Sequence, residues 1–432
     1  MNKILNKSWL RWLVAPSIIF LILVFYYNSC LKTLSVSFYD EFLWTGRSYF
    51  FEYYIKGDFK NKIWQSYESY DQPKLTEYAY GAWLYPTYLK EKRNEKSLDY
   101  KNFLIKNGFG NVDDRGYNSL EEYFAKNNID GTKAIKIINK ARLLNVFLLA
   151  GSVVLVYLLI LQNMNAVTGI IFSGCYGLNY LIINTCLKAH SEALFLFTFN
   201  AAFLFMNLYF KKKKNIYLIL FSIFTGLCVS TKLNGIMLMI IFMILNIIIF
   251  GVIQKNKIKN ILFKSILSLS ICMAVFWILN PFVYSHPFKN TVYLFDWRMK
   301  TATTVQSNLS KENYLPNNLL RIKKIFENFY FSKQTTNFNG VKIINKLDLP
   351  KIYGITLFIL FIFGLVYCLK MAWRKNTAAI IMCGSFFIIL LMMSYYLILD
   401  WPRYYVQLVL FFAIFQLLGL FLIVKKICKS VV

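Results

Sequence analysis

The sequence contains few acidic residues and very few histidines. Asp and Glu number 21 against 49 Lys and Arg, which gives a net charge of +28, and only two histidines, His190 and His286, occur in 432 residues. The basic residues stand in short tracts between apolar runs, as topology signals and phospholipid anchors do, so the charge does not indicate nucleic-acid binding. The 8 cysteines form no C-x-x-C or Cys/His framework, so neither a disulfide scaffold nor a structural metal site is expected.

Apolar residues dominate the rest of the composition. The chain is 57% hydrophobic and 18% aromatic, with a mean hydropathy of +0.46, whereas soluble proteins are about 45–50% apolar. This predicts an all-α polytopic membrane protein. The first apolar run follows Lys3 and Lys7 but is about 20 residues long and lacks an A-x-A site, so we predict an uncleaved anchor. With no internal repeat, low-complexity linker or separate soluble part, residues 1–432 are predicted to form one transmembrane domain.

Apolar runs of about 17–25 residues predict about ten transmembrane helices. The predicted spans are 10–31, 142–162, 164–187, 191–210, 215–231, 233–253, 261–284, 351–369, 377–399 and 404–424. Basic clusters fall on alternate short connections, and the positive-inside rule then places both termini in the cytoplasm. This topology puts the long segments 32–140 and 285–350 on the extracytoplasmic side.

The first long segment, 32–140, is rich in Tyr and Trp among charges. This pattern is typical of amphipathic helices that lie in the membrane interface. Within the segment, Ser119 followed three residues later by Glu122 predicts the start of a helix.

Ionisable side chains gather at the extracytoplasmic ends of the predicted spans. They are Asp40, Glu41, Asp71, Lys74, Lys188, His190, Glu192, Lys232, His286, Asp400 and Arg403. The middles of the spans are almost bare of charge. A charge near the bilayer has a desolvation cost and is therefore more often retained for a function than by accident, so the convergence predicts an active site on this face. Each residue also has a structural interpretation: Lys and Arg snorkel to the interface, and a lone histidine is more often a hydrogen-bonded structural residue than a metal ligand.

The mixture of charges favours group transfer. A carboxylate can deprotonate a hydroxyl, while nearby cations neutralise a departing phosphate. Lys232 lies in a connection so short that its ammonium stays near the bilayer surface, where a phosphate is a natural partner. The alternative is a transporter or flippase for a lipid-linked glycan, although pumps usually place ionisable groups at the bilayer midplane. A non-catalytic membrane assembly factor is a further alternative.

Five short strings occur in order along the chain. They are Phe38-Tyr39-Asp40-Glu41, Tyr70-Asp71-Gln72-Pro73-Lys74-Leu75, Ser191-Glu192-Ala193-Leu194, Thr231-Lys232-Leu233-Asn234-Gly235 and Arg403-Tyr404. Together they resemble the motifs of the GT-C superfamily of polyprenyl-phosphate-sugar-dependent glycosyltransferases, in the branch of protein O-mannosyltransferases and lipid A aminoarabinose transferases. Gln72 stands where the mannosyltransferases commonly carry His, and Lys74 replaces the second Pro, so the acceptor class is not carried over from the resemblance.

The resemblance implies an inverting membrane glycosyltransferase, hexosyl or pentosyl, working on the extracytoplasmic side of a membrane, the plasma membrane if the protein is prokaryotic. Its partners would be membrane lipids, an undecaprenyl- or dolichyl-phosphate-linked sugar as donor, and a hydroxyl of a protein, lipid or glycan as acceptor. The implied roles are general base for Asp40, support of the base for Glu41, lipid-phosphate binding for Lys232, Arg403 and Tyr404, and sugar or acceptor contact for Asp71, Lys74, His190 and Glu192. No cofactor is required; a divalent metal is not supported, and His286 is only a weak candidate ligand.

Overall fold

Most of the described part of the chain is helical. The computed structural model describes residues 8–36, 38–109, 117, 119–255, 257–306, 313–330 and 349–430. Within these ranges the only β-pairing is an isolated bridge between Tyr314 and Leu399. The all-α polytopic fold class predicted from composition is confirmed.

Eight helical segments in the described ranges are long and apolar enough to cross a membrane. They are Leu10–Leu31 (η1 with α2, Ala15–Leu31), α9 (Gly131–Leu161), α12 (Glu192–Lys212), Leu233–Ile253 (η5, α14 and η6), α15 (Ile258–Leu279), Tyr353–Trp373 of α19 (Leu349–Trp373), α20 (Thr377–Tyr396) and Val406–Lys426 (η12 with α21, Val409–Ser430). Eight of the predicted spans therefore correspond to single membrane-length segments.

The two remaining predicted spans differ from a simple crossing. The span predicted at 164–187 is divided into α10 (Ala166–Gly177) and α11 (Tyr180–Cys186), which are bent by 57°. The bend arises because the Asn179 side chain accepts a hydrogen bond from the Leu181 N–H and so starts a new helix. The span predicted at 215–231 is α13 (Asn215–Thr231), which has 17 residues and is shorter than a typical crossing of about 20 residues.

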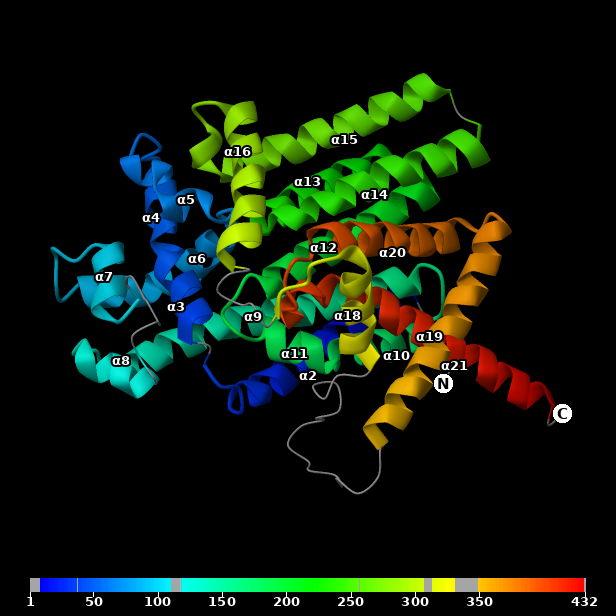
Figure 1. Cartoon of the computed structure of the whole chain (residues 1–432), viewed down its shortest axis with the longest axis horizontal. Coiled ribbons are helices and arrows are strands. Elements are labelled where there is room, and N and C mark those ends of the chain that lie inside the picture. Colours follow the sequence, from blue (N-terminus) through cyan, green and yellow to red (C-terminus); the bar gives the residue numbers. More distant parts are fainter. Residues whose placement is uncertain are drawn as a thin grey trace.

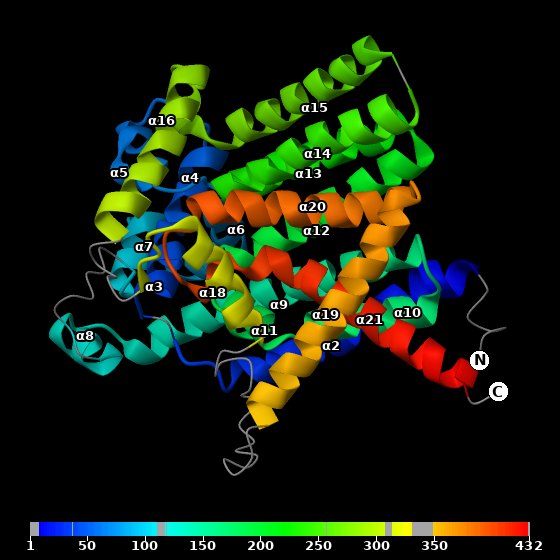
Figure 2. The same ribbon diagram turned by 45° about the vertical axis from the view of Figure 1, so that its right-hand side comes forward.

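The helices have a clear polarity in space. The α14–α15 and α19–α20 hairpins, the start of α2 and the end of α21 lie at one end of the bundle (Figure 2). The short helices of the first long segment lie at the other end, together with α16 (Pro287–Lys300), as Figure 1 shows. They are α3 (Phe38–Gly46), α4 (Phe50–Ile55), α5 (Tyr67–Tyr70), α6 (Leu75–Lys92), α7 (Tyr100–Lys106) and α8 (Leu120–Lys126). The two long segments therefore both contribute helices to this end of the bundle.

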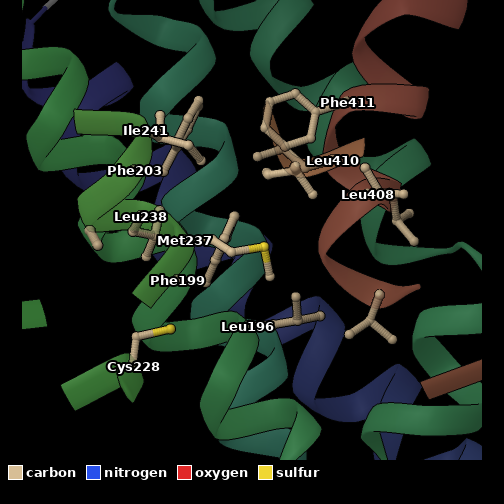
Figure 3. Close-up of a cluster of buried hydrophobic side chains, with 14 of the residues drawn as sticks. Leu196, Phe199, Phe203, Cys228, Met237, Leu238, Ile241, Leu408, Leu410 and Phe411 are labelled. Atoms are coloured by element: carbon tan, nitrogen blue, oxygen red, sulfur yellow. The ribbon is translucent and has the colours of Figure 1, made fainter. Parts of the chain in front are cut away.

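Most of the buried apolar side chains in the described residues belong to two hydrophobic cores. The larger lies in the bundle, where Phe199 and Phe203 of α12 pack near Ile241 of α14 (Met237–Asn246) and Phe411 of α21 (Figure 3). The smaller is made mostly of aromatic side chains from the first long segment. Its buried members include Tyr49, Phe50, Tyr80, Tyr88 and Tyr100. These rings pack against one another, so many of the aromatic residues assigned to a membrane interface instead form the interior of this small helical unit.

Candidate active site

Glu41 anchors the start of α3 in the protein interior. Arg142 of α9 donates from Nε and Nη2 to the two carboxylate oxygens of Glu41, both at 2.7 Å, and the Ala189 N–H donates to Oε1 at 2.7 Å. The side chains of Glu41 and Arg142 are 0% and 2% exposed. Arg142 also donates to the carbonyls of Leu34 and Ser35. This fully hydrogen-bonded pair joins α3, α9 and the loop before α12. It also fixes the position of the neighbouring carboxylate, Asp40, in the same turn of α3.

Asp40 pairs with the cation predicted near the C-terminal span. Arg403 Nη1 lies 2.7 Å from Asp40 Oδ2. Arg403 belongs to the 3-10 turn η11 (Pro402–Tyr404), and its guanidinium lies over the rings of Trp401 and Tyr404, at 4.6 and 5.8 Å from their centroids. Residues separated by more than 360 positions thus meet in one ion pair.

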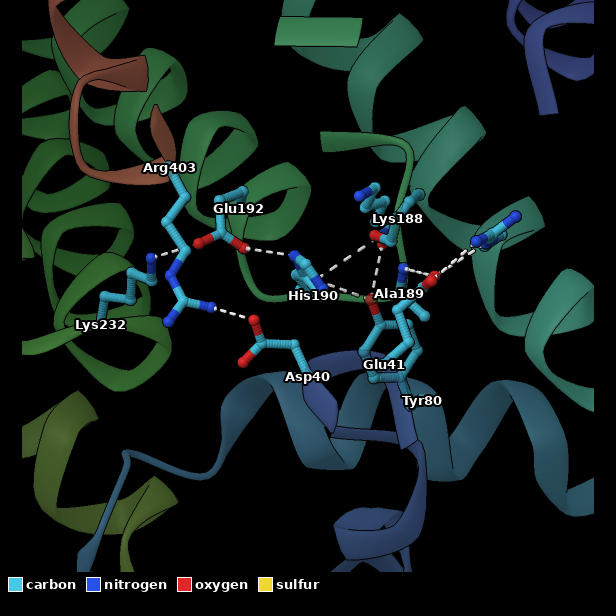
Figure 4. Close-up of polar contacts among 11 residues, drawn as sticks. Asp40, Glu41, Tyr80, Lys188, Ala189, His190, Glu192, Lys232 and Arg403 are labelled. Carbon is cyan, nitrogen blue, oxygen red and sulfur yellow. Dashed lines mark hydrogen bonds and ion pairs between the residues drawn. The ribbon is translucent and has the colours of Figure 1, made fainter. Parts of the chain in front are cut away.

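Lys232 and Glu192 form a second pair beside the first. Lys232 Nζ lies 2.5 Å from Glu192 Oε1 and 5.8 Å from the centroid of the Tyr404 ring. Lys232 follows α13 in an extended conformation, and a Cβ on Gly235 would come within 2.7 Å of the Val229 nitrogen. Only glycine therefore lets the turn fold back closely enough on α13 to hold Lys232 in this place. Figure 4 shows Asp40, Glu192, Lys232 and Arg403 turned toward one another, and we call these four residues the Asp40 cluster.

His190 lies beside the Asp40 cluster with an unusual lack of partners. Its backbone is held, because the carbonyl accepts from the Tyr80 hydroxyl at 2.6 Å. Its ring is buried, and among the described residues neither ring nitrogen has a hydrogen-bond partner; Nδ1 lies 3.8 Å from Glu192 Oε2 (Figure 4). Burial lowers the pKa of His190, against the opposing effect of Glu192, Asp40 and Glu41, so the ring is neutral at pH 7.

Asp40 is ionised at neutral pH. Burial by itself would raise the pKa of Asp40, but Arg403, His190 and Lys232 lower it, and the balance falls below the ordinary value of 3.8. A carboxylate with charge-paired cations on one side suits a site where a hydroxyl is deprotonated next to a phosphate.

Asp71 and Lys74 lie in a separate charged group. Asp71 accepts from Arg47 at 2.8 Å and from Arg298 of α16 at 3.3 Å. Lys74 is 1% exposed and its ammonium donates to both oxygens of Glu77 at 2.8 Å. Burial lowers the pKa of Lys74 and raises that of Glu77 to about 7.

The two groups are connected through Asn280. The Lys74 N–H donates to Asn280 Oδ1 at 3.1 Å, and Asn280 Nδ2 donates to Ser230 Oγ at 3.4 Å, two residues before Lys232. No side-chain hydrogen bond or ion pair joins Asp71 or Lys74 directly to the Asp40 cluster in the described part of the chain.

Among the residues that the structure describes, His286 takes part in none of the ion pairs of these two groups. It is exposed, and its backbone carbonyl accepts from the Asn290 N–H at the start of α16. In the described ranges, there is no group of three or more His, Cys, Asp or Glu side chains that could hold a metal ion.

Sequence reasoning missed four charged residues of these groups, namely Arg142, Glu77, Arg47 and Arg298. Two of them carried a signal in the sequence. Arg142 is the first residue of the span predicted at 142–162 and was counted as part of an apolar run. A lone arginine at that depth is a signal for a buried carboxylate partner. Glu77, three residues after Lys74, carried the helical i,i+3 spacing of an ion pair.

The fold and the site define a multi-pass, all-helical membrane protein with paired carboxylates and cations clustered at one end of its helix bundle. Residues 123–292 match the family model of dolichyl-phosphate-mannose-protein mannosyltransferases, a GT-C family, which confirms the resemblance read from the short motifs. The match covers 170 of the 432 residues and contains Arg142, His190, Glu192 and Lys232, while Asp40 and Arg403 lie outside it. No curated protein and no solved structure matches this chain.

Proposed function

We propose that the protein transfers one sugar from a polyprenyl-phosphate carrier to a hydroxyl acceptor, with inversion at the anomeric carbon. The observation that carries the proposal is the Asp40 cluster, in which the partly exposed carboxylate of Asp40 pairs with Arg403 and a second pair, Glu192 with Lys232, lies beside it. A base for the acceptor and positive charge for the leaving phosphate are the two requirements of this reaction. The family match over 123–292 supports a lipid-phosphate-linked donor.

The proposed roles follow from which groups can reach a substrate. Arg403 and Lys232 bind the donor phosphate, and both lie 5.8 Å from the centroid of the Tyr404 ring. The acceptor oxygen attacks the anomeric carbon, its proton passes to Asp40, and the phosphate leaves with the electron pair of the broken glycosidic bond. Glu41 holds the helical turn that presents Asp40.

The remaining predicted residues divide into two sets. Glu192 belongs to the Asp40 cluster and His190 borders it, and we retain both as contacts for the sugar. Lys74 and Asp71 are engaged by Glu77, Arg47 and Arg298, and we propose that they hold α5, α6 and α16 together beneath the acceptor.

The site is proposed to face the extracytoplasmic side. The basic connections Lys211–Lys214 and Lys370–Lys375 lie on hairpins at the end of the bundle away from α3 and α16, and the positive-inside rule assigns that end to the cytoplasm. By the same rule both termini are cytoplasmic.

The proposal is tested by Asp40→Asn in purified protein supplied with dolichyl-phosphate mannose and a hydroxyl acceptor. We expect transfer to fall by at least about 10²-fold, because the proton acceptor is lost, while the protein still folds and binds polyprenyl phosphate. Asp296→Asn is the matched control, since Asp296 is 52% exposed and, in the part of the chain that the structure describes, pairs only with Lys300 at the surface of α16. Wild-type rates in Asp40→Asn would contradict the assigned role.

A transporter or flippase for lipid-linked glycans is the second candidate. The bend between α10 and α11 favours it, because interrupted spans are common in transporters. The two candidates differ in the fate of the donor: a transferase releases the free carrier phosphate, whereas a flippase leaves the donor intact.

A further inference from the structure

The ion pairs near the site differ in how completely their partners are used. The Glu41–Arg142 pair is bidentate and fully buried, and the remaining Arg142 donor reaches backbone carbonyls. The Asp40–Arg403 pair is joined by one nitrogen–oxygen contact, and its side chains are 29% and 20% exposed. The first pair has the geometry of a permanent structural contact, and the second has the geometry of an exchangeable one.

Lys232 resembles Arg403 in this respect. In the described part of the chain its ammonium makes one hydrogen bond, to Glu192 Oε1, although an ammonium has three N–H donors. The other carboxylate oxygen, Glu192 Oε2, is buried and has no hydrogen bond from any residue that the structure describes. Both cations assigned to the donor phosphate are therefore neutralised, each by a single contact with a carboxylate.

The charges of the site add a constraint. With neutral His190, the Asp40 cluster contains two negative and two positive side chains, so a bound phosphate would bring an unbalanced negative charge into a largely buried place. An anion that enters such a site must compete with the carboxylates that already hold the cations.

We propose that Asp40 and Glu192 act as internal anions that occupy Arg403 and Lys232 until the donor phosphate replaces them. This inference rests on the proposed function, because it assumes that the two cations bind the donor. The exchange adds a positioning and timing role: Asp40 loses its paired cation only when a donor is present. Freed from Arg403, the Asp40 carboxylate has a higher proton affinity, so Asp40 becomes a stronger base when an acceptor hydroxyl must be deprotonated.

The exchange also accounts for the unpartnered atoms beside the cluster. His190 Nδ1 faces Glu192 Oε2 at 3.8 Å, and neither atom has a hydrogen-bond partner among the described residues. When Lys232 turns to a phosphate, the Glu192 carboxylate needs a new donor, and a small movement toward His190 supplies one. A buried polar group without a partner is costly, so this spare donor–acceptor pair is best explained by a bound state in which it is used.

The test measures binding of farnesyl phosphate, a probe with a phosphate and an isoprenoid chain but no sugar, to purified protein by calorimetry. Asp40→Asn and Glu192→Gln are each expected to bind the probe roughly five- to tenfold more tightly than wild type, because the competing anion is removed. Farnesol, which lacks the phosphate, is expected to bind all three proteins equally.

Asp296→Asn is the matched control, because it also removes one negative charge, but from a surface carboxylate of α16 whose cation is Lys300. It is expected to leave farnesyl phosphate affinity unchanged; equal tightening in Asp296→Asn would show a general electrostatic effect and overturn the exchange. Unchanged or weaker binding in Asp40→Asn would overturn it too. Asp40 is partly exposed, so Asp40→Asn decides the question even if Glu192→Gln, at a buried position, fails to fold.

The outcome is separable from that of the proposed function. If transfer occurs but Asp40→Asn does not tighten binding of the probe, the exchange is wrong and the transferase stands. If no transfer occurs and binding tightens, the exchange is a property of a phosphate site with another purpose.

Discussion

Replacing Arg142 by methionine is expected to destabilise the protein strongly. The substitution keeps much of the side-chain volume but removes both Arg142 donors from the Glu41 carboxylate, which is 0% exposed. The hydrogen bond from the Ala189 N–H to this carboxylate is retained. Breaking one partner of a buried ion pair costs about 3–5 kcal/mol. The carbonyls of Leu34 and Ser35 also lose their contacts with Arg142, at about 1 kcal/mol each.

The assay is unfolding of the purified protein in detergent micelles, with the double variant Glu41→Gln/Arg142→Met measured in parallel. The double variant contains no buried charge at this place, so it is expected to recover a large part of the loss. Lys106→Met is the control, since the Lys106–Glu95 pair is exposed and contributes little. Wild-type stability in Arg142→Met, or a double variant less stable than the single one, would refute the reasoning.

Two further predictions concern helix packing and pH. A Cβ on Gly364 of α19 would lie 1.8 Å from the Phe415 carbonyl oxygen of α21, so Gly364→Ala is expected to lower the stability of the protein in detergent by about 1–3 kcal/mol or more. Gly174→Ala is the control and is expected to be neutral, because a Cβ on Gly174 would have no heavy atom within 4 Å. Equal effects of the two substitutions would contradict close α19–α21 packing. Because the pKa of Asp40 is lowered, its ionised form and its pairing with Arg403 persist as pH falls toward 4 and are lost only below the ordinary pKa of 3.8. Initial rates with limiting donor are therefore expected to show no decline between pH 8 and pH 5. A half-maximal rate near pH 6 would contradict this.

The ends of the spans could be predicted because hydropathy and charge act over long stretches of chain. Once the apolar runs alternate across a membrane, Asp40, Glu192, Lys232 and Arg403 must lie on the same face, and the structure brings them into one cluster. Local signals were also sufficient at Ser119, whose hydroxyl accepts from the Glu122 N–H and starts α8 as predicted.

The partners within that face could not be predicted in the same way. Pairing depends on how each helix is rotated about its axis and how closely it packs, and a single sequence contains little information on either. Glu41 and Asp40 are neighbours in sequence, yet one meets Arg142 and the other Arg403 because adjacent positions on a helix point about 100° apart. The bend at Asn179 was missed because a helix cap inside an apolar run looks like an ordinary polar residue in a span.

The measurement that most directly tests the account is the fate of dolichyl-phosphate mannose when the wild-type protein is reconstituted in liposomes with a hydroxyl acceptor. Mass spectrometry of the lipids and nuclear magnetic resonance of the product follow the carrier and the anomeric configuration. The account predicts free dolichyl phosphate and a sugar joined to the acceptor with inverted configuration. Donor that crosses the bilayer intact, or a product with retained configuration, would contradict it.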